Sequence, residues 1–270
     1  MLHGEALAVP IPIFLINLDR SKDRLAYMRR QAAELGLQME RLPAVEGRNV
    51  PEWLRSEFTP STRMSDGEVG CYASHLVAAR TIVARDLPYA IVLEDDAELS
   101  AGFNAIAARA VASVPADWDY LHLCTRFKKT VVRVVAIDGE HSLVRYPLPP
   151  SRTAAYILSN AGARKWLAPM QRVRAIDLDN RFAWQQDLKV YGVFPAIAEG
   201  CSGSASTVRA KAPKRQKPSF PSMVYGMFWS MREIGITIYL KAMALDAVNS
   251  LRKHATGVAR VSVIDNNLMH

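Results

Sequence analysis

The sequence predicts a mixed α/β domain with a largely parallel central sheet flanked by helices, followed by a helical C-terminal extension. Residues 11–44 open the chain with a strand–helix–strand pattern. Residues 89–93 form a short apolar run without polar alternation, which is typical of a parallel strand buried on both faces. Strand and helix patterns continue to about residue 205. We therefore expect one α/β domain over most of the chain.

The first strand is predicted over residues 11–18, an apolar run that ends in polar residues as a buried strand does at a functional edge. Ser21 can cap the helix that follows, with Asp23 in its first turn and Gly36 at its stop. Residues 38–44 are predicted as the second strand, which completes a β-α-β unit.

A second helix is predicted over residues 65–85, because Ser65 and Glu68 have the spacing of a capping box and apolar residues follow at helical intervals. Pro88 separates this helix from the apolar strand at residues 89–93. That strand leads directly into three adjacent acidic residues, Glu94, Asp95 and Asp96.

The rest of the chain divides into three predicted segments. The α/β domain, residues 1–208, continues with a helix at 101–114, a strand at 118–123, a hairpin of 130–136 and 142–146, a strand at 154–158 and a helix at 160–170. Residues 209–222 form a Pro-rich arm or linker, in which positions 209–217 carry five cations and no acid. Residues 223–270 form the extension, which is helix-compatible to about residue 253.

Composition narrows the classes of function. The 270 residues are 50% hydrophobic and 22% charged, and a net charge of +8 favours anionic partners such as nucleic acid, acidic lipid or phosphorylated substrates. Cys71, Cys124 and Cys201 are far apart and form no metal-ligand pattern with the six histidines, so a reduced, cytoplasmic compartment is expected. No stretch approaches the roughly 20 apolar residues that span a bilayer, and the N-terminus lacks a signal-peptide pattern. A soluble or peripheral protein is expected.

The acidic triplet is the first candidate site. Three adjacent carboxylates after a buried strand repel one another and lose solvation, which favours a bound cation. Hard oxygen ligands suit Mg²⁺ or Mn²⁺, and α/β folds bind ligands at the carboxyl edge of the sheet. A solvated acidic turn that caps the next helix explains the triplet alone equally well.

Two further signals are weaker. Ser74 and His75 lie on the predicted helix at 65–85, where a lone histidine is more often structural. Arg20, Lys22 and Arg24 follow the first strand, where they could meet a diphosphate, although such charges usually face solvent.

Four motifs follow one another in the chain. They are Ile-Asn-Leu-Asp-Arg-Ser at 16–21 with Asp-Arg at 23–24, Ala-Val-Glu-Gly at 44–47, Gly-Glu-Val-Gly-Cys at 67–71 with Ser-His-Leu at 74–76, and Val-Leu-Glu-Asp-Asp-Ala at 92–97. In this order they resemble glycosyltransferase family 25. The family includes lipooligosaccharide and collagen-modifying galactosyltransferases. The resemblance covers about residues 11–208, and four ordered motifs together favour a functional triplet.

The resemblance implies a GT-A-type fold, a UDP-sugar donor carrying galactose or glucose, and Mn²⁺ or Mg²⁺ held by an acidic motif of the D-x-D kind. Glu94 replaces the first Asp of that motif. The implied metal contact is chiefly through Asp96, with Glu94 or Asp95 towards the ribose or the metal-bound waters.

Other positions match by the same resemblance. Asn17, Leu18 and Arg24 are implied on the uridine and diphosphate side of the pocket, and Ser74 and His75 are implied as further pocket residues. Residues 176–177 resemble a later Val-Asp motif, which makes Asp177 the first candidate general base, with Asp179 and Asp187 behind it. Residues 195–207 resemble the closing Pro- and Ser-rich segment.

The implied reaction is transfer of a hexose, with inversion, to a saccharide hydroxyl of a lipopolysaccharide- or lipooligosaccharide-type glycolipid, or of an oligosaccharide. The cations of 209–217 beside an amphipathic helix would suit docking on the anionic inner face of the cytoplasmic membrane. A solvated linker and a helix packed on the domain explain them equally well.

Two alternatives remain from the sequence. Charge and the basic arm also suit a nucleic-acid-binding protein, but no recognised binding motif is present, so no nucleic acid partner is expected. Metal-dependent nucleotidyl transfer or hydrolysis at the same carboxylates would keep the fold and change the chemistry.

Overall fold

The computed structural model describes residues 10–59, 64–124, 129–200, 219–256 and 261–265. Its strands are β1 (Ile13–Asn17), β2 (Glu40–Pro43), β3 (Tyr89–Glu94), β4 (Ala97–Leu99), β5 (Tyr120–His122), β6 (Val131–Ala136), β7 (Ser142–Arg145), β8 (Ala155–Ser159), β9 (Val190–Phe194), β10 (Ala198–Gly200) and β11 (Val263–Asp265). Its helices are α1 (Lys22–Glu34), α2 (Glu52–Arg55), α3 (Asp66–Ala84), α4 (Phe103–Ser113), α5 (Asn160–Trp166), α6 (Ile176–Asp179), α7 (Phe220–Ile234) and α8 (Ile236–Thr256), with 3-10 turns η1 (Gly47–Asn49) and η2 (Asn180–Gln185).

Nine of the described strands form one sheet in the order β11-β6-β7-β9-β5-β8-β3-β1-β2, and β10 pairs with β4 in a small ribbon. The predicted β-α-β opening is confirmed, because β2, β1 and β3 are parallel neighbours. Four of the eight pairings in the large sheet are antiparallel, so the sheet is mixed, as predicted, but less parallel than expected. One reason is the β6–β7 hairpin, since so short a connection joins only antiparallel strands.

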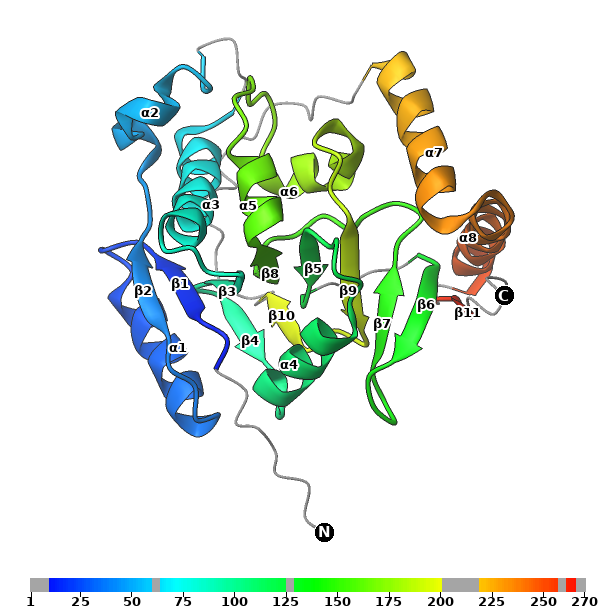
Figure 1. Ribbon diagram of the computed structural model, residues 1–270, viewed down its shortest axis with the longest axis horizontal. Coiled ribbons are helices and arrows are strands. Elements are labelled where there is room, and N and C mark those ends of the chain that lie inside the picture. Colours follow the sequence, from blue (N-terminus) through cyan, green and yellow to red (C-terminus); the bar gives the residue numbers. More distant parts are fainter. Residues whose placement is uncertain (1–9, 60–63, 125–128, 201–218, 257–260, 266–270) are drawn as a thin grey trace.

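Helices cover both faces of the sheet. Phe14 and Ile16 of β1 pack with α3 and α5, whereas Ile13 and Leu15 pack with α1 and α4. Figure 1 shows these two pairs of helices on opposite sides of the sheet. Successive side chains of a strand point to opposite faces, which explains why this strand is apolar without alternation.

The helix predictions agree with the structure in most places. The capping box of α3 is present: the Glu68 backbone N–H donates to Ser65 Oγ at 3.3 Å, and the Ser65 backbone N–H donates to the Glu68 carboxylate at 2.8 Å. Ser21 precedes α1, as predicted, but its side chain makes no capping hydrogen bond. The helix predicted over 160–170 ends at Trp166. The α4 and β6–β7 hairpin predictions are confirmed.

The C-terminal region is two helices rather than one continuous stretch. Gly235, with φ of +86°, separates α7 from α8, and the pair is bent by 116°. The region is also continuous with the main domain, because β11 pairs in parallel with β6 at the sheet edge. Residues Val132 and Ile264 of these strands share a buried cluster with Ile238 of α8. The segment boundaries stay a prediction, and most of the arm at 209–222 and all of 201–208 lie outside the described residues.

Among the described helices, none by itself has both the length and the apolar character to cross a membrane. The α7–α8 pair meets those two criteria only when its bent halves are taken together.

Candidate functional site

A cleft of about 270 Å³ opens beside the carboxyl ends of β1 and β3. Each of the four sequence motifs contributes to its wall. The lining residues are Ile16, Leu18, Arg20, Arg24, Ala44, Val45, Glu46, Gly47, Arg48, Asp66, Gly67, Gly70, Cys71, Ser74, His75, Glu94 and Asp95. The parallel β2-β1-β3 order explains this convergence, because the carboxyl ends of parallel neighbours meet at one edge of a sheet.

Two glycines let one wall of the cleft close tightly. A Cβ atom on Gly70 would lie 2.5 Å from the backbone oxygen of Val45, and one on Gly47 would lie 1.8 Å from the backbone oxygen of Asp66. The buried Ser74 reinforces the contact, since its hydroxyl accepts from Val45 N at 2.8 Å and donates to the Gly70 carbonyl at 2.7 Å. Ser74 therefore lines the cleft, and its hydroxyl joins α3 to the 44–47 segment.

Three of the predicted donor-binding residues form one network. Asn17 Nδ2 donates to Asp95 Oδ2 at 2.7 Å, and an Arg24 guanidinium nitrogen donates to Asp95 Oδ1 at 2.9 Å. Arg41, which the sequence analysis did not single out, donates to Asn17 Oδ1 at 3.0 Å. Leu18 and Arg24 both line the cleft. The charge of Asp95 is thus compensated within the protein, and its two carboxylate oxygens fix the Asn17 and Arg24 side chains of the first motif.

Glu94 and Asp96 differ from Asp95 in their surroundings. Burial, together with the charges of Glu94 and Asp95, raises the pKa of Asp96 to about 6, although Arg24 opposes the rise. Burial also raises the pKa of Glu94, but contacts with His75 and Thr153 and the charge of Arg152 leave that pKa below its usual value. The two groups offer carboxylate oxygens in a partly buried, anionic setting, which fits a hard divalent cation.

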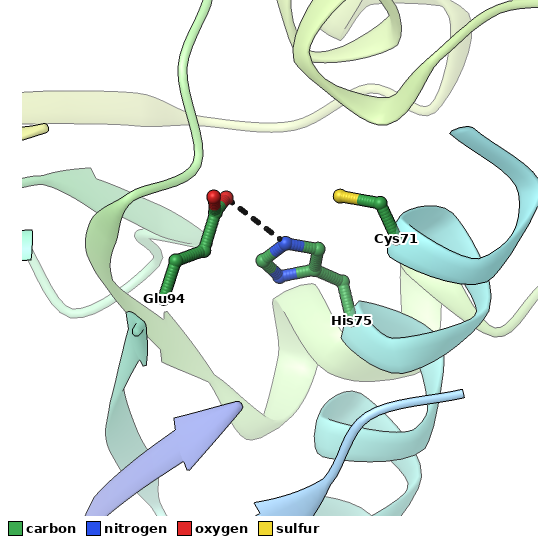
Figure 2. Close-up of side chains that lie close together, drawn as sticks. All are labelled: Cys71, His75 and Glu94. Carbon is green, nitrogen blue, oxygen red and sulfur yellow. Dashed lines mark ion pairs between the residues drawn. The ribbon is translucent and has the colours of Figure 1, made fainter. Parts of the chain in front are cut away.

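His75 is fully buried and lies between the cleft and the core. Its Nδ1 lies 2.8 Å from the Tyr156 hydroxyl, and its Nε2 lies 3.3 Å from Glu94 Oε1, an ion-pair distance without hydrogen-bond geometry. Cys71 completes a group whose ligand atoms all lie within 4.8 Å of one another. Figure 2 shows the thiol, the imidazole and the carboxylate directed into the same space.

This group corrects the expectation that no cysteine forms a metal-ligand pattern with a histidine. The pattern was missed because Glu94 is remote in sequence and joins only through the fold. One signal was available: Cys71 and His75 are four residues apart, which places them on the same face of a helix.

The three candidate bases lie in different settings. Asp177 is half-buried. Burial and the charge of Glu94 are the main causes that raise the pKa of Cys71, and the charge of Asp177 adds to that rise. Asp177 is therefore within electrostatic reach of the cleft. Asp179 instead faces the core: Arg174 Nε donates to its Oδ1 at 2.7 Å and the Tyr72 hydroxyl donates to its Oδ2 at 3.0 Å. Asp179 therefore does not reach the cleft, and its role is to hold α6 in place.

Asp187 is also directed away from the cleft. Its Oδ1 accepts hydrogen bonds from Trp229 Nε1 and from Arg232, both at 2.9 Å. The hydrogen bond from Trp229 holds the pKa of Asp187 below its usual value despite partial burial. Asp187 thus connects the end of η2 to α7, and both of these contacts hold it outside the cleft. None of the three predicted bases is among the cleft-lining residues, and Asp177 is the one whose charge acts on Cys71 of the third motif.

The family model described as Glycosyltransferase family 25 (LPS biosynthesis protein) matches residues 10–181. A relative named inactive glycosyltransferase 25 family member 3, from Mus musculus, is 29% identical over 215 residues, covering 69% of this chain and 36% of that protein. A glycosyltransferase 25 family member from Drosophila pseudoobscura pseudoobscura is 29% identical over 183 residues, covering 61% and 28%. Procollagen galactosyltransferase 2 from Homo sapiens is 26% identical over 167 residues, covering 57% and 26%.

The chain thus spans about a third or less of the length of these curated relatives. The family match, by contrast, includes all four motifs, the cleft that they line and the α6 segment of Asp177. On that match, the chain belongs to glycosyltransferase family 25.

Proposed function

We propose that this protein is a metal-dependent glycosyltransferase that transfers a hexose, galactose or glucose, from a UDP-sugar to a saccharide hydroxyl. The observation that carries the proposal is the convergence of four separate family motifs on one cleft. The cleft wall combines apolar side chains, arginines and carboxylates, which are the groups that a base, a diphosphate and a cation require. We propose in addition that the α/β domain has a fold of the GT-A type.

The cleft residues divide by chemistry. Ile16, Leu18 and Val45 offer apolar surface for the uracil ring, and Arg24 offers a cation for the diphosphate. Glu94 and the adjacent Asp96, which is not itself among the cleft-lining residues, would hold Mn²⁺ or Mg²⁺. The raised pKa of Asp96 is what a carboxylate with little compensation within the protein shows, and a cation would supply that compensation. Such an ion, when bound, neutralises charge on the leaving diphosphate.

The acceptor hydroxyl needs a base, because it is a poor nucleophile near neutral pH. In the proposed reaction Asp177 takes the hydroxyl proton as the oxygen bonds to the anomeric carbon. The bond from that carbon to the diphosphate oxygen breaks, and UDP leaves with the electron pair. Attack from the opposite face inverts the anomeric centre, and no covalent enzyme intermediate is required.

The acceptor in this proposal is a lipopolysaccharide-type glycolipid at the anionic cytoplasmic face of a membrane. The surface of α7 and α8 supports it: Phe220, Phe228, Ile236, Leu240 and Leu251 are each more than half exposed. The two acids of these helices turn inward, with Glu233 paired to Arg145 and Asp246 accepting from Thr130. An apolar surface whose exposed ionisable groups are cations suits insertion at an anionic interface.

Vesicle co-sedimentation of the full chain tests this docking. Phe228→Ser and Leu240→Ser should each reduce binding to anionic phosphatidylglycerol vesicles, whereas Val135→Ser, at an exposed position on β6, should not. Equal binding by all three variants would exclude the α7–α8 surface and direct attention to the arm at 209–217.

The reaction itself is tested by calorimetric titration with UDP, UDP-galactose and UDP-glucose, with and without Mn²⁺. Asp96→Asn should abolish the metal-dependent part of binding, while Asp117→Asn, an exposed carboxylate paired with Lys189 on the surface, should bind as the wild type does. Metal-independent binding, or full binding by Asp96→Asn, would refute the metal assignment. The preferred donor then enters assays with saccharide acceptors.

Some relatives are named inactive, which makes a binding protein without transferase activity the competing outcome. Donor binding without glycoside formation, across a panel of acceptors, would support that outcome. Release of free sugar or pyrophosphate without glycoside would instead support hydrolysis or nucleotidyl transfer. Salt-dependent retention on DNA without any nucleotide-sugar binding would favour a nucleic-acid-binding protein.

A further inference from the structure

Beside the carboxylate pair proposed for Mn²⁺, the cleft contains a second set of ligands of different chemistry. We propose that Cys71, His75 and Glu94 form a site for a thiophilic divalent cation such as Zn²⁺, and that an ion bound there inhibits donor binding. The site uses sulfur, nitrogen and oxygen donors from α3 and the end of β3 (Figure 2). Its existence does not depend on the proposed function, but its inhibitory effect does.

The first argument is the unsatisfied imidazole nitrogen. His75 is fully buried, and its Nε2 has no hydrogen-bond partner although it faces Glu94 Oε1 at 3.3 Å. A buried polar atom without a partner is unfavourable, because it has lost its hydrogen bonds to water and gained none in return. A cation binds Nε2 when the ring proton is on Nδ1, which faces the Tyr156 hydroxyl. In that tautomer the Nε2 lone pair points at the Glu94 carboxylate, and a cation between them would satisfy both groups.

The second argument is the distance. Two ligand atoms about 2.0–2.1 Å from one tetrahedral ion lie about 3.3–3.4 Å apart, and the separation of Nε2 and Oε1 is 3.3 Å. The thiol is within 4.8 Å of both atoms. At a Zn–S distance of about 2.3 Å, the sulfur would have to approach the other ligands by at most about 1.2 Å. The movement required is small for a half-buried side chain at the edge of a cleft.

The third argument is the support behind the ligands. The Tyr156 hydroxyl lies 2.8 Å from His75 Nδ1, and the Thr153 hydroxyl donates to Glu94 Oε1. Metal-binding histidines and carboxylates usually have such outer hydrogen-bond partners, which fix the ligand in its binding orientation. Thr153 donates to the same Glu94 oxygen that faces Nε2, and that oxygen has a second lone pair for an ion. Tyr156 itself is held by stacking on Tyr120, with ring centroids 4.7 Å apart. Two of the three ligands are therefore already oriented.

The sulfur ligand decides which ion is favoured. Thiolate selects Zn²⁺ over Mg²⁺ and Mn²⁺, which prefer oxygen. Binding would convert the Cys71 thiol to a thiolate and release one proton to solvent. Three protein ligands leave the fourth tetrahedral position for water or another small ligand from the cleft.

The two metal sites share Glu94, and this sharing gives the functional consequence. An ion on Cys71 and His75 would draw Glu94 away from Asp96, and it would place positive charge and a ligand within the donor cleft. We therefore expect Zn²⁺ to weaken Mn²⁺-dependent UDP binding, and Cys71→Ser to relieve that inhibition.

The test begins with a Cys124→Ser/Cys201→Ser double variant, which leaves Cys71 as the single thiol. Co²⁺, used as a spectroscopic probe for Zn²⁺, should give a thiolate-to-cobalt charge-transfer band that excess Zn²⁺ removes. Zn²⁺ should also protect the thiol from alkylation by iodoacetamide. Adding Cys71→Ser should abolish the band, and Tyr156→Phe, which keeps the ring and removes the hydroxyl, should weaken Co²⁺ binding about 10–100-fold.

The outcomes separate the two proposals. If stoichiometric Co²⁺ gives no thiolate band, or if Zn²⁺ leaves the alkylation rate unchanged, the site does not exist, whatever the result of UDP titration. If the band is present but UDP does not bind in any metal, the site stands and the proposed function fails. Asp96→Asn should keep the band, since Asp96 is not among its ligands, and loss of the band in that variant would overturn the three-ligand assignment by showing that the thiolate site requires the Asp96 carboxylate.

Discussion

Gly70→Ala is the substitution that most directly tests how the cleft is built. The added Cβ would lie 2.5 Å from the Val45 oxygen and 2.8 Å from the Gly47 nitrogen, and both are backbone atoms. Ordinary contact begins near 3.4 Å, so α3 and the 44–47 segment must separate by up to about 0.9 Å. Neither neighbour can respond by a change of rotamer.

The expected free energy combines opposing effects. Alanine is preferred to glycine inside a helix by about 0.5–1 kcal/mol, which favours the variant. Overpacking against an immovable neighbour costs about 1–3 kcal/mol. Separation also stretches the hydrogen bond from Val45 N to Ser74 Oγ, worth about 0.5–1.5 kcal/mol. The net expectation is destabilisation by about 1–3 kcal/mol, the opposite sign from the helix preference alone.

Urea unfolding at constant pH measures this difference, and UDP titration measures its effect on the cleft. Gly139→Ala is the control, because a Cβ there meets nothing within 4 Å. That variant should unfold as the wild type does, while Gly70→Ala should unfold at lower urea and bind UDP more weakly. An increase in stability of Gly70→Ala by about 0.5–1 kcal/mol, as at an unobstructed helix position, would refute the tight contact between α3 and 44–47.

Three further predictions concern the core. Burial lowers the pKa of His122 to about 3, so between that value and the ordinary pKa of about 6.5 only the unfolded chain binds a proton at this histidine. The free energy of unfolding should therefore fall with decreasing pH, by up to about 1.4 kcal/mol per pH unit over that range. Urea unfolding of His122→Leu should lack this part of the pH dependence. Gly226→Ala, whose Cβ would lie 2.6 Å from the Trp184 ring, should lift α7 and change tryptophan fluorescence. Arg172→Met should leave the buried Glu57 unpaired and lower unfolding stability by about 3–5 kcal/mol; a loss under about 1 kcal/mol would contradict that.

Local patterns predicted the elements that position the cleft. The 89–93 run predicted a strand buried on both faces, and the prediction holds because helices cover both faces of the sheet there. The Ser65–Glu68 spacing predicted the start of α3, and this prediction holds because a capping box uses only residues that are neighbours in the chain. β4, β9, β10 and β11 were not predicted. β4, β10 and β11 are three-residue strands, too short to show a periodicity, and exist through their pairing partners. β9 has five residues and pairs with β5 and β7, so its length does not explain the miss.

The candidate bases show the limit of local patterns most clearly. Asp177 and Asp179 are two residues apart on a four-residue helix, and sequence ranked them by resemblance alone. The structure distinguishes the two by their hydrogen-bond partners, since Arg174 donates to one carboxylate oxygen of Asp179 and Tyr72 donates to the other. Asp187 is similarly taken by Trp229 of α7, a contact that no pattern around residue 187 could indicate.

The acidic triplet behaves as two groups because β3 alternates its faces up to its end. Val92 packs on the α3 side and Leu93 on the α1 side, so Glu94 continues towards His75 and Asp95 towards Arg24 and Asn17. Asp95 thereby has two donors, whereas Asp96 has the raised pKa expected of a carboxyl with less compensation. The repulsion that made the triplet suggest a cation is therefore not shared equally. It acts chiefly on Asp96, whose pKa the charge of Glu94 helps to raise. Glu94 also faces His75, which is why the same glutamate can belong to both of the proposed metal sites.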